Sequence, residues 1–195
     1  MRTSLLGAGG RISSGHGRIE GGNAVVASTG PGGTDFDRVE ADTLVVSVGA
    51  SPRELPTAVP DGERILTWTQ IYALDEVPDN LVVVGSGVTG AELAQAYLGL
   101  GSRVTLVSSR DQVLPGEDSD AAKVIEEVFK REGMQVLSRS RMSAVERTAD
   151  GVLVRLEDGR TVEGSHALLA VGSVPNTRAV SYTHLRAHET VLELV

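Results

Sequence analysis

A glycine-rich turn between an apolar strand and a helix constrains this chain more than any other feature. Residues 81–84 form an uninterrupted apolar run, as in a strand buried on both faces, and residues 85–92 continue as Gly-Ser-Gly-Val-Thr-Gly-Ala-Glu. The spacing Gly-x-Gly-x-x-Gly is common by chance in a glycine-rich chain. Here a helix is predicted at 88–100 and a second apolar strand at 103–107, which is the context that gives the motif meaning. The pattern predicts a strand–helix–strand unit with parallel strands.

Each glycine of this turn has a physical role in binding a dinucleotide. Gly85 permits the tight turn, Gly87 lets a pyrophosphate approach the backbone, and Gly90 lets the helix lie close to the strand. Free N–H groups and the positive end of the helix dipole then face the phosphates. A plain glycine turn before a helix is the alternative explanation, and the flanking strands favour dinucleotide binding over it.

The end of the second predicted strand bears on the choice of nicotinamide cofactor. An Asp or Glu at this place would bind the ribose 2′-hydroxyl of NAD, but residues 107–110 read Val-Ser-Ser-Arg. The hydroxyls of Ser108 and Ser109 could bond a 2′-phosphate, and Arg110 supplies a cation beside them. Arg110 could instead face solvent, and the acidic side chain of Asp111 close by keeps NAD possible as the cofactor. We therefore expect NADP or NAD as the cofactor, with the sequence favouring NADP.

The composition excludes several classes of protein. Of 195 residues, 41% are hydrophobic, which is enough for a packed core, and the formal net charge of −8 argues against a nucleic-acid partner. The chain has no cysteine, so it holds no disulfide, thiolate ligand or cysteine nucleophile, and no metal site is expected. No apolar run approaches the length of a membrane span, about eighteen residues. A cytoplasmic location without a membrane span is therefore expected.

The remaining segments predict further strands and two more helices. Strands are expected at 24–28, 36–39, 41–48, 135–137, 143–147, 152–156, 160–162 and 166–171, and helices at 68–74 and 118–132. The run at 41–48 is apolar enough to be buried on both faces of a sheet. Asp158-Gly159 indicates a hairpin turn between two of the later strands.

Four segments resemble successive landmarks of one family: residues 48–53, 85–92, 113–118 and 171–177. Over residues 1–177 the chain resembles the pyridine nucleotide-disulfide oxidoreductases, and among them the lipoamide-dehydrogenase-like NAD(P)H:quinone reductases. The resemblance implies an α/β, Rossmann-like FAD/NAD(P)-binding fold, in which a parallel sheet with helices is joined by an antiparallel β-meander. It also implies hydride transfer from NAD(P)H to FAD and on to a small-molecule acceptor, a quinone or a disulfide. A disulfide reductase of the dihydrolipoamide dehydrogenase type and a non-catalytic nucleotide-binding module remain as alternatives.

The resemblance also assigns residues. Glu92 matches a family glutamate near the nicotinamide–flavin contact, Val88 stands where many members have a tyrosine over the nicotinamide, and Gly172 matches a glycine that the cofactor approaches. No catalytic residue is assigned. The predicted cofactor-binding residues are Gly49, Gly85, Ser86, Gly87, Val88, Thr89, Gly90, Glu92, Ser108, Ser109, Arg110 and Gly172.

The same resemblance divides the chain. Residues 1–79 are expected to form part of an FAD-binding domain, 80–172 the NAD(P)-binding domain, and 173–180 a return towards the first. The glycine motif for FAD and the C-terminal interface domain are missing. We therefore expect the chain to be a piece of a longer, homodimeric parent and to be inactive on its own. Residues 181–195 resemble translated sequencing-adapter DNA, and the histidines at 184 and 188 within them lack a third ligand for zinc.

Overall fold

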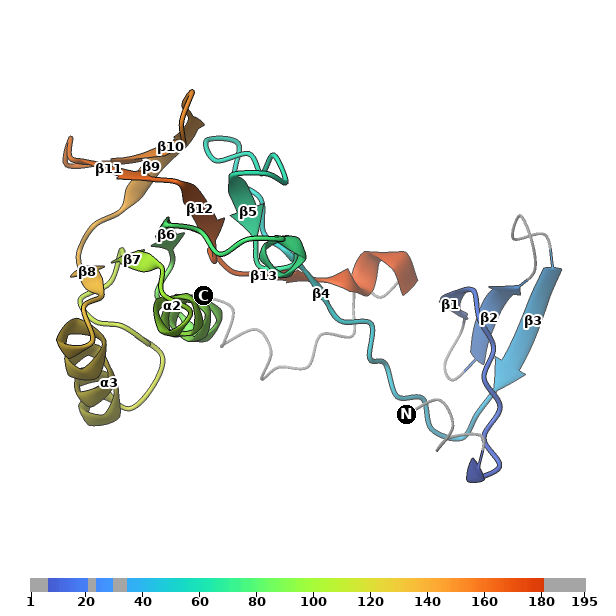
Figure 1. Cartoon of the computed structure of the whole chain (residues 1–195). Coiled ribbons are helices and arrows are strands. Elements are labelled where there is room, and N and C mark those ends of the chain that lie inside the picture. Colours follow the sequence, from blue (N-terminus) through green and yellow to red (C-terminus); the bar gives the residue numbers. More distant parts are fainter. Residues whose placement is uncertain (1–6, 21–23, 30–34, 181–195) are drawn as a thin grey trace. The chain divides into compact units, whose positions relative to one another are not determined.

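The computed structural model describes residues 7–20, 24–29 and 35–180 (Figure 1). The chain divides into two compact units, one of residues 52–174 and the other of residues 1–51 together with 175–195. One sequence prediction, the adapter-like tail at 181–195, lies outside the described residues.

A five-stranded sheet forms the centre of the unit of residues 52–174. In spatial order its strands are β5 (Ile65–Thr67), β12 (His166–Leu169), β6 (Asn80–Val84), β7 (Arg103–Val107) and β8 (Gln135–Leu137). Each neighbouring pair is parallel. Helix α2 (Val88–Gly99) joins β6 to β7, and helix α3 (Ser119–Arg131) joins β7 to β8. The predicted strand–helix–strand unit and the parallel sheet are confirmed, whereas the sequence did not reveal β5.

The alternation of side chains along β6 builds a core on each face of the sheet. Leu81 and Val83 are fully buried in a cluster that includes Ala94 and Tyr97 of α2. Val82 and Val84 face the opposite way, into a second cluster. Because both faces are covered, a strand of this kind needs apolar residues at successive positions, as the sequence analysis expected.

The second cluster is completed by an antiparallel β-meander. It consists of β9 (Met142–Arg147), β10 (Val152–Leu156) and β11 (Thr161–Gly164), with β10 in the middle. Val152, Val154 and Leu156 of β10 are buried in the cluster. The turn between β10 and β11 contains Gly159 with φ of +88°, the left-handed conformation that glycine adopts without strain. The predicted meander and its hairpin are confirmed.

The two helices predicted outside the strand–helix–strand unit differ in outcome. Helix α3 begins after Asp118, whose carboxylate accepts hydrogen bonds from the N–H groups of Asp120 and Ala121, each at 3.0 Å. The helix expected at 68–74 is wrong in type and length, since only the short 3₁₀ helix η1 (Ile71–Ala73) forms there. Gln70 Oε1 accepts hydrogen bonds from the N–H and hydroxyl of Thr67, which folds the chain back before η1.

The other unit contains a small antiparallel sheet, of β1 (His16–Glu20), β2 (Ala24–Thr29) and β3 (Asp35–Glu40). The strands predicted at 24–28 and 36–39 are confirmed as β2 and β3. The strand predicted at 41–48 is wrong: no described strand pairs with this run, and Val45 is 83% exposed. An apolar run forms a buried strand only where partner strands and a covering layer are supplied.

Short elements complete the described residues. Strands β4 (Ala50–Pro52) and β13 (Ser173–Pro175) form a two-stranded sheet, and the 3₁₀ helix η2 (Asn176–Val180) follows β13. Strand β12 ends two residues earlier than predicted, although the Ala170 N–H still bonds to the Val84 carbonyl at 2.8 Å. No helix in the part of the chain that the structure describes is long and apolar enough to cross a membrane.

Candidate dinucleotide-binding site

The candidate site lies at the carboxyl edge of the five-stranded sheet. Because all five strands are parallel, their carboxyl ends share this edge. The glycine turn follows β6, residues 108–110 follow β7, and Gly172 lies beyond β12. The chain leaves β6 towards β7 on one side, while β12 and β5 lie on the other, and ligands of open α/β sheets bind at such a switch point.

The first glycine is required by backbone packing. Gly85 has φ of +110°, and a Cβ built on it would lie 2.2 Å from the carbonyl oxygen of Ala170. Its N–H donates to the Val107 carbonyl of the next strand at 2.9 Å. The turn is therefore held between the ends of β12 and β7, with no room for a side chain.

The third glycine is required by the helix. A Cβ on Gly90 would lie 1.9 Å from the carbonyl oxygen of Gly85, far inside van der Waals contact. The first turn of α2 thus packs directly on the turn that precedes it. This is the close approach of helix to strand that the sequence motif predicts.

At the second glycine, no neighbouring atom excludes a side chain. Nothing lies within 4 Å of a Cβ built on Gly87, and its φ of −68° with ψ of −176° is open to any residue. Gly87 is the N-cap of α2, and no side chain caps the helix there. Val88 and Thr89 are exposed beside it. The first N–H groups of a helix have no partner within it, so this open end has donors and space for a phosphate.

Ser86 and Ser108 link the glycine turn to the end of β7. Both side chains are buried, and their hydroxyl oxygens are 2.6 Å apart. The Ser108 hydroxyl also accepts from the Arg110 N–H at 3.1 Å and lies 3.2 Å from the Arg110 carbonyl oxygen. Ser108 is 0% exposed, so the structure places its hydroxyl inside the protein and not on the ligand side of the edge.

The residues after Ser108 are exposed. Ser109 and Arg110 both face solvent, and the guanidinium of Arg110 has no ion-pair partner among the residues that the structure describes. The carboxylate of Asp111 is paired with the guanidinium of Arg139 at 2.7 Å. This pairing offsets the negative charge that would otherwise stand beside Arg110.

Three predicted residues lie farther from the turn along the chain. Glu92 is exposed on α2 but stands after the first turn, which contains no acid, so the helix dipole acts on it only weakly. Gly172 has φ of +108°, and its carbonyl accepts from the Arg53 N–H at 3.0 Å. Gly49, with φ of +71°, belongs to the other unit, where its carbonyl accepts from the Asn176 N–H.

Residues 108–110, which follow β7, form the serine turn, and sequence reasoning missed how the loop after this turn is attached. The N–H of Leu114 donates to the Ser86 carbonyl at 2.8 Å, and the N–H of Val113 donates to the Glu126 carboxylate at 2.9 Å. The pairing of Glu126 with Lys130, four residues later on α3, was visible in the sequence. The bond to Val113 was not, because it depends on how the loop folds back on the helix.

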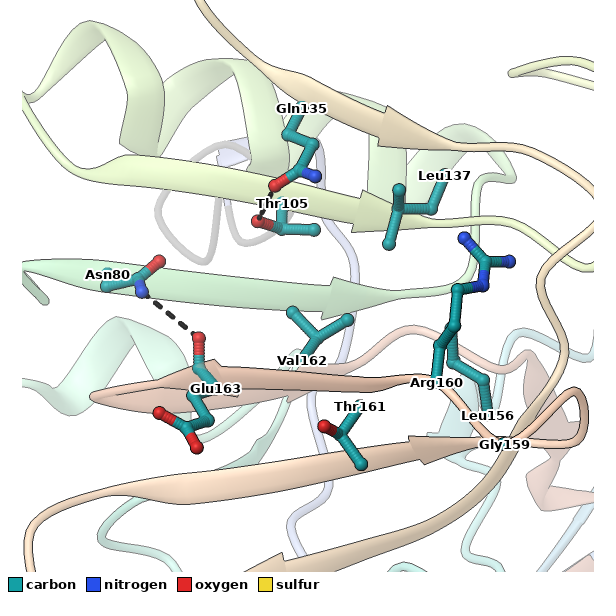
Figure 2. A pocket seen from close by; sticks show the side chains of 10 residues that line it. All are labelled: Asn80, Thr105, Gln135, Leu137, Leu156, Gly159, Arg160, Thr161, Val162 and Glu163. Atoms are coloured by element: carbon teal, nitrogen blue, oxygen red, sulfur yellow. Dashed lines mark hydrogen bonds between the residues drawn. The ribbon is translucent and has the colours of Figure 1, made fainter.

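A hollow of about 530 Å³ lies elsewhere, between the sheet and β11 (Figure 2). Its lining residues are Asn80, Thr105, Gln135, Leu137, Leu156, Gly159, Arg160, Thr161, Val162 and Glu163. In Figure 2 Arg160 extends from the meander towards Leu137, and its guanidinium is bonded to Asp158 and to the hydroxyl of Ser140. No predicted site residue lines this hollow. Among the described residues, no group of three acidic or histidine side chains could hold a metal ion.

The parallel sheet, the interlocked glycines and the open helix N-terminus define a dinucleotide-binding α/β unit. The chain belongs to the pyridine nucleotide-disulphide oxidoreductase family, whose model matches residues 5–190. The members are enzymes that use FAD and NAD(P). The family and fold class expected from the sequence are thereby confirmed.

Individual relatives agree with this assignment. The chain is 62% identical over 138 residues to an NAD(P)H dehydrogenase (quinone) of Mycobacterium tuberculosis, which covers 71% of this chain and 28% of that protein. It is 36% identical over 137 residues to a dihydrolipoyl dehydrogenase of Bacillus subtilis, a match that covers 70% of this chain and 30% of that protein. The crystal structure of LpdA from Mycobacterium tuberculosis matches with a TM-score of 0.82 and 49% identity, over 92% of this chain and 40% of that one. The chain spans less than half the length of each.

Proposed function

We propose that this chain is the NAD(P)-binding part of an FAD-dependent oxidoreductase, and that the glycine turn after β6 binds the pyrophosphate of the nicotinamide dinucleotide. The observation that carries the proposal is the space at Gly87. Gly85 and Gly90 are explained by packing, whereas no neighbouring atom excludes a side chain at position 87. A missing side chain at an open helix N-terminus is accounted for by a phosphate that must come close to the backbone.

The residues around the turn would have separate roles. The N–H groups at the start of α2, at Val88 and Thr89, would hold the pyrophosphate. Gly172 would allow a close approach beyond β12, and Glu92 would lie towards the nicotinamide, as in the family. When bound, the nicotinamide supplies the hydride and the flavin accepts it, so the protein contributes orientation and electrostatics.

We propose NADP as the preferred cofactor, with NAD accepted less well. Ser109 and Arg110 are exposed at the end of β7, where the 2′-phosphate would lie. Asp111 is paired with Arg139, which reduces its repulsion of a phosphate. Ser108 would act indirectly, since its hydroxyl is buried.

The assignment of domains is also part of the proposal. Residues 1–79, including Gly49, would belong mainly to an FAD-binding domain, 80–172 to the NAD(P)-binding domain, and 173–180 to the return between them. Strand β5, at residues 65–67, is an exception, because it pairs with β12 of the nucleotide-binding sheet. We further propose that the whole protein is a cytoplasmic homodimer that reduces a small-molecule acceptor.

A quinone is the acceptor that we favour, because the relative with 62% identity is an NAD(P)H dehydrogenase (quinone). A disulfide acceptor is the second candidate, supported by 36% identity to a dihydrolipoyl dehydrogenase. A steady-state assay of the longer parental protein with NADPH and either a quinone or lipoamide would separate the two.

Calorimetric titration of the chain with NADPH and NADH tests the binding proposal. We expect both to bind, and we expect Gly87→Val to abolish binding while the melting temperature falls by no more than about 4 °C, the cost of Val at a helix N-cap. Gly99→Ala, at the exposed end of α2, is the matched control. Unchanged affinity in Gly87→Val would exclude the glycine turn as the binding site.

A second measurement addresses turnover. We expect the chain alone to carry no absorbance at 400–500 nm and to show little NADPH:quinone activity, since it spans 28% of its mycobacterial relative. A bound yellow chromophore with turnover would show that the flavin site is complete within this chain.

A further inference from the structure

The buried serine pair joins two parts of the candidate site that would hold different ends of one ligand. Ser86 is the residue between the first two glycines, and Ser108 is the first residue beyond β7. Their hydroxyl oxygens are 2.6 Å apart, with side chains that are 5% and 0% exposed. Neither hydroxyl can therefore reach a ligand outside the protein, and both are available to connect one turn to the other.

The Ser108 hydroxyl has three polar neighbours. It accepts a hydrogen bond from the Arg110 N–H and lies within hydrogen-bond distance of the Arg110 carbonyl oxygen and of the Ser86 hydroxyl. A serine hydroxyl donates once and accepts twice, so either serine can be the donor of the bond that joins Ser86 to Ser108. In both cases the chain of contacts runs from Ser86 through Ser108 to the backbone of Arg110.

Further bonds hold the same segment from its other side. The Arg139 N–H donates to the Arg110 carbonyl at 2.9 Å, and the Ser140 N–H donates to the Ser108 carbonyl at 2.7 Å. The backbone of Arg110 is thus fixed, while its side chain is exposed. Among these contacts, the Ser86–Ser108 bond connects the position of Arg110 directly to the glycine turn.

We propose that Ser86 and Ser108 form a latch that determines cofactor specificity by setting Arg110 at a fixed position relative to the glycine turn. The inference rests on the proposed function, in which the glycine turn holds the pyrophosphate and Arg110 faces the 2′-phosphate. A rigid link lets one ligand satisfy both sites at once, with less ordering required on binding. Ser86 and Ser108 are positioning residues, and they act on the preference for NADPH through Arg110.

The test is a set of calorimetric titrations with NADPH and NADH on the full chain. The variants are Ser86→Ala, Ser108→Ala, Arg110→Ala and the double variant Ser108→Ala/Arg110→Ala. Each serine variant is expected to reduce the ratio of NADPH to NADH affinity about 3- to 10-fold, as for the loss of a hydrogen bond that orders a contact. In the Arg110→Ala background the serine change should leave the ratio unaltered, because contacts that act together are not additive.

Ser102→Ala is the matched control. Ser102 is also buried, its hydroxyl donates to the Pro78 carbonyl at 2.6 Å, and it lies at the amino end of β7, on the opposite edge of the sheet. Loss of the Ser102 hydroxyl should lower the melting temperature, as Ser108→Ala does, and should leave the ratio of NADPH to NADH affinity unchanged. If Ser108→Ala does not fold, Ser86→Ala carries the same comparison, and Ser86→Thr, which keeps the hydroxyl, should restore the ratio.

The outcomes separate the latch from the function on which it rests. A parent chain that binds neither cofactor would overturn the proposed function and the latch with it. A parent that binds both, with serine variants whose ratio stays at the parent value, would overturn the latch alone. A serine effect that is equally large without Arg110 would show that the serines do not act through that arginine, and would also overturn the proposal.

Discussion

The turns that follow β6 and β7 stand at neighbouring strand ends, yet they are held in place by different means. The glycine turn is fixed by exclusion, because side chains at Gly85 or Gly90 would overlap backbone atoms of Ala170 or Gly85. The serine turn is fixed by hydroxyl groups, with Ser108 bonded to Ser86 and to the backbone of Arg110. The first arrangement admits one residue type, whereas the second can be altered by small changes of side chain. Under the proposed function, the part that holds the shared pyrophosphate therefore tolerates little change, and the part that faces the 2′-phosphate is adjustable.

Gly90→Ala gives the sharpest test of the glycine turn. The new Cβ would lie 1.9 Å from the Gly85 carbonyl oxygen, and neither backbone segment can move freely. We expect the free energy of unfolding to fall by about 3 kcal/mol or more, measured by urea denaturation. Gly99→Ala, where nothing lies within 4 Å, should be neutral or stabilise by up to about 1 kcal/mol. Equal stability of the two variants would contradict the close packing of α2 on the turn.

Arg110→Ala tests the serine turn from its ligand side. A charge-assisted contact to phosphate contributes about 1.5–3 kcal/mol, so NADPH affinity should fall roughly 10- to 100-fold while NADH affinity is nearly unchanged. Arg103→Ala removes the same charge from the amino end of β7 and should alter neither affinity by more than about 2-fold, as for a distant surface charge. Equal losses of NADPH and NADH in the Arg110 variant would mean that this arginine supports the fold or a shared phosphate.

Gly87→Ala separates packing from binding within the glycine turn. The backbone of Gly87 is open to any residue and the space beside it is empty, so the stability should fall by no more than about 1 kcal/mol, the cost of Ala in place of Gly at a helix N-cap. The added methyl group occupies the space proposed for the pyrophosphate, which NADPH and NADH share. Both affinities should fall about 10-fold by calorimetry, or about 1.4 kcal/mol. A loss confined to one cofactor would contradict the division of roles between the two turns.

Two valine-rich runs show how much of the fold the sequence could predict. Residues 81–84 and 44–46 look alike, yet the first is a buried central strand and the second is unpaired, with Val45 83% exposed. For the first run, the glycine turn and the following helix identified a layer that would cover it. The second run had no such support, and local apolarity does not reveal whether a partner strand exists. Strand β5 was missed for the complementary reason: it is three residues long and is buried through its pairing with β12.

In the candidate site, too, features set by local backbone geometry were predictable and features set by distant partners were not. The spacing of Gly85, Gly87 and Gly90 was predictable because each role depends on local backbone geometry. The buried position of Ser108 was not, because its partner Ser86 is 22 residues earlier and the two meet only when β6 and β7 pair. Sequence reasoning therefore identified the residues of the serine turn but could not distinguish those that face a ligand from those that hold others in place.

The smallest expected effect concerns the loop beyond the serine turn. Glu126 is a largely buried residue of α3, and burial, the largest single influence, raises the pKa of its carboxyl group. Hydrogen bonds from Lys130 and the Val113 N–H, with the charge of Lys130, outweigh burial and hold this pKa below its ordinary value of 4.5. The ionised form is thus stabilised by folding.

Glu126→Gln keeps the shape of this side chain and removes its charge. Since the folded pKa is the lower one, the contribution of Glu126 to stability is complete above pH 4.5 and is lost as the pH falls through the folded value. We expect the variant to be about 1 kcal/mol less stable than the parent at pH 7, with a difference that shrinks below pH 4.5. Glu127→Gln, on the exposed side of the helix, should show no such pH dependence in urea denaturation. If the stability difference of Glu126→Gln stays constant down to pH 3, the carboxylate charge does not stabilise the loop. The Leu114–Ser86 hydrogen bond would then attach the loop to the glycine turn without a contribution from α3.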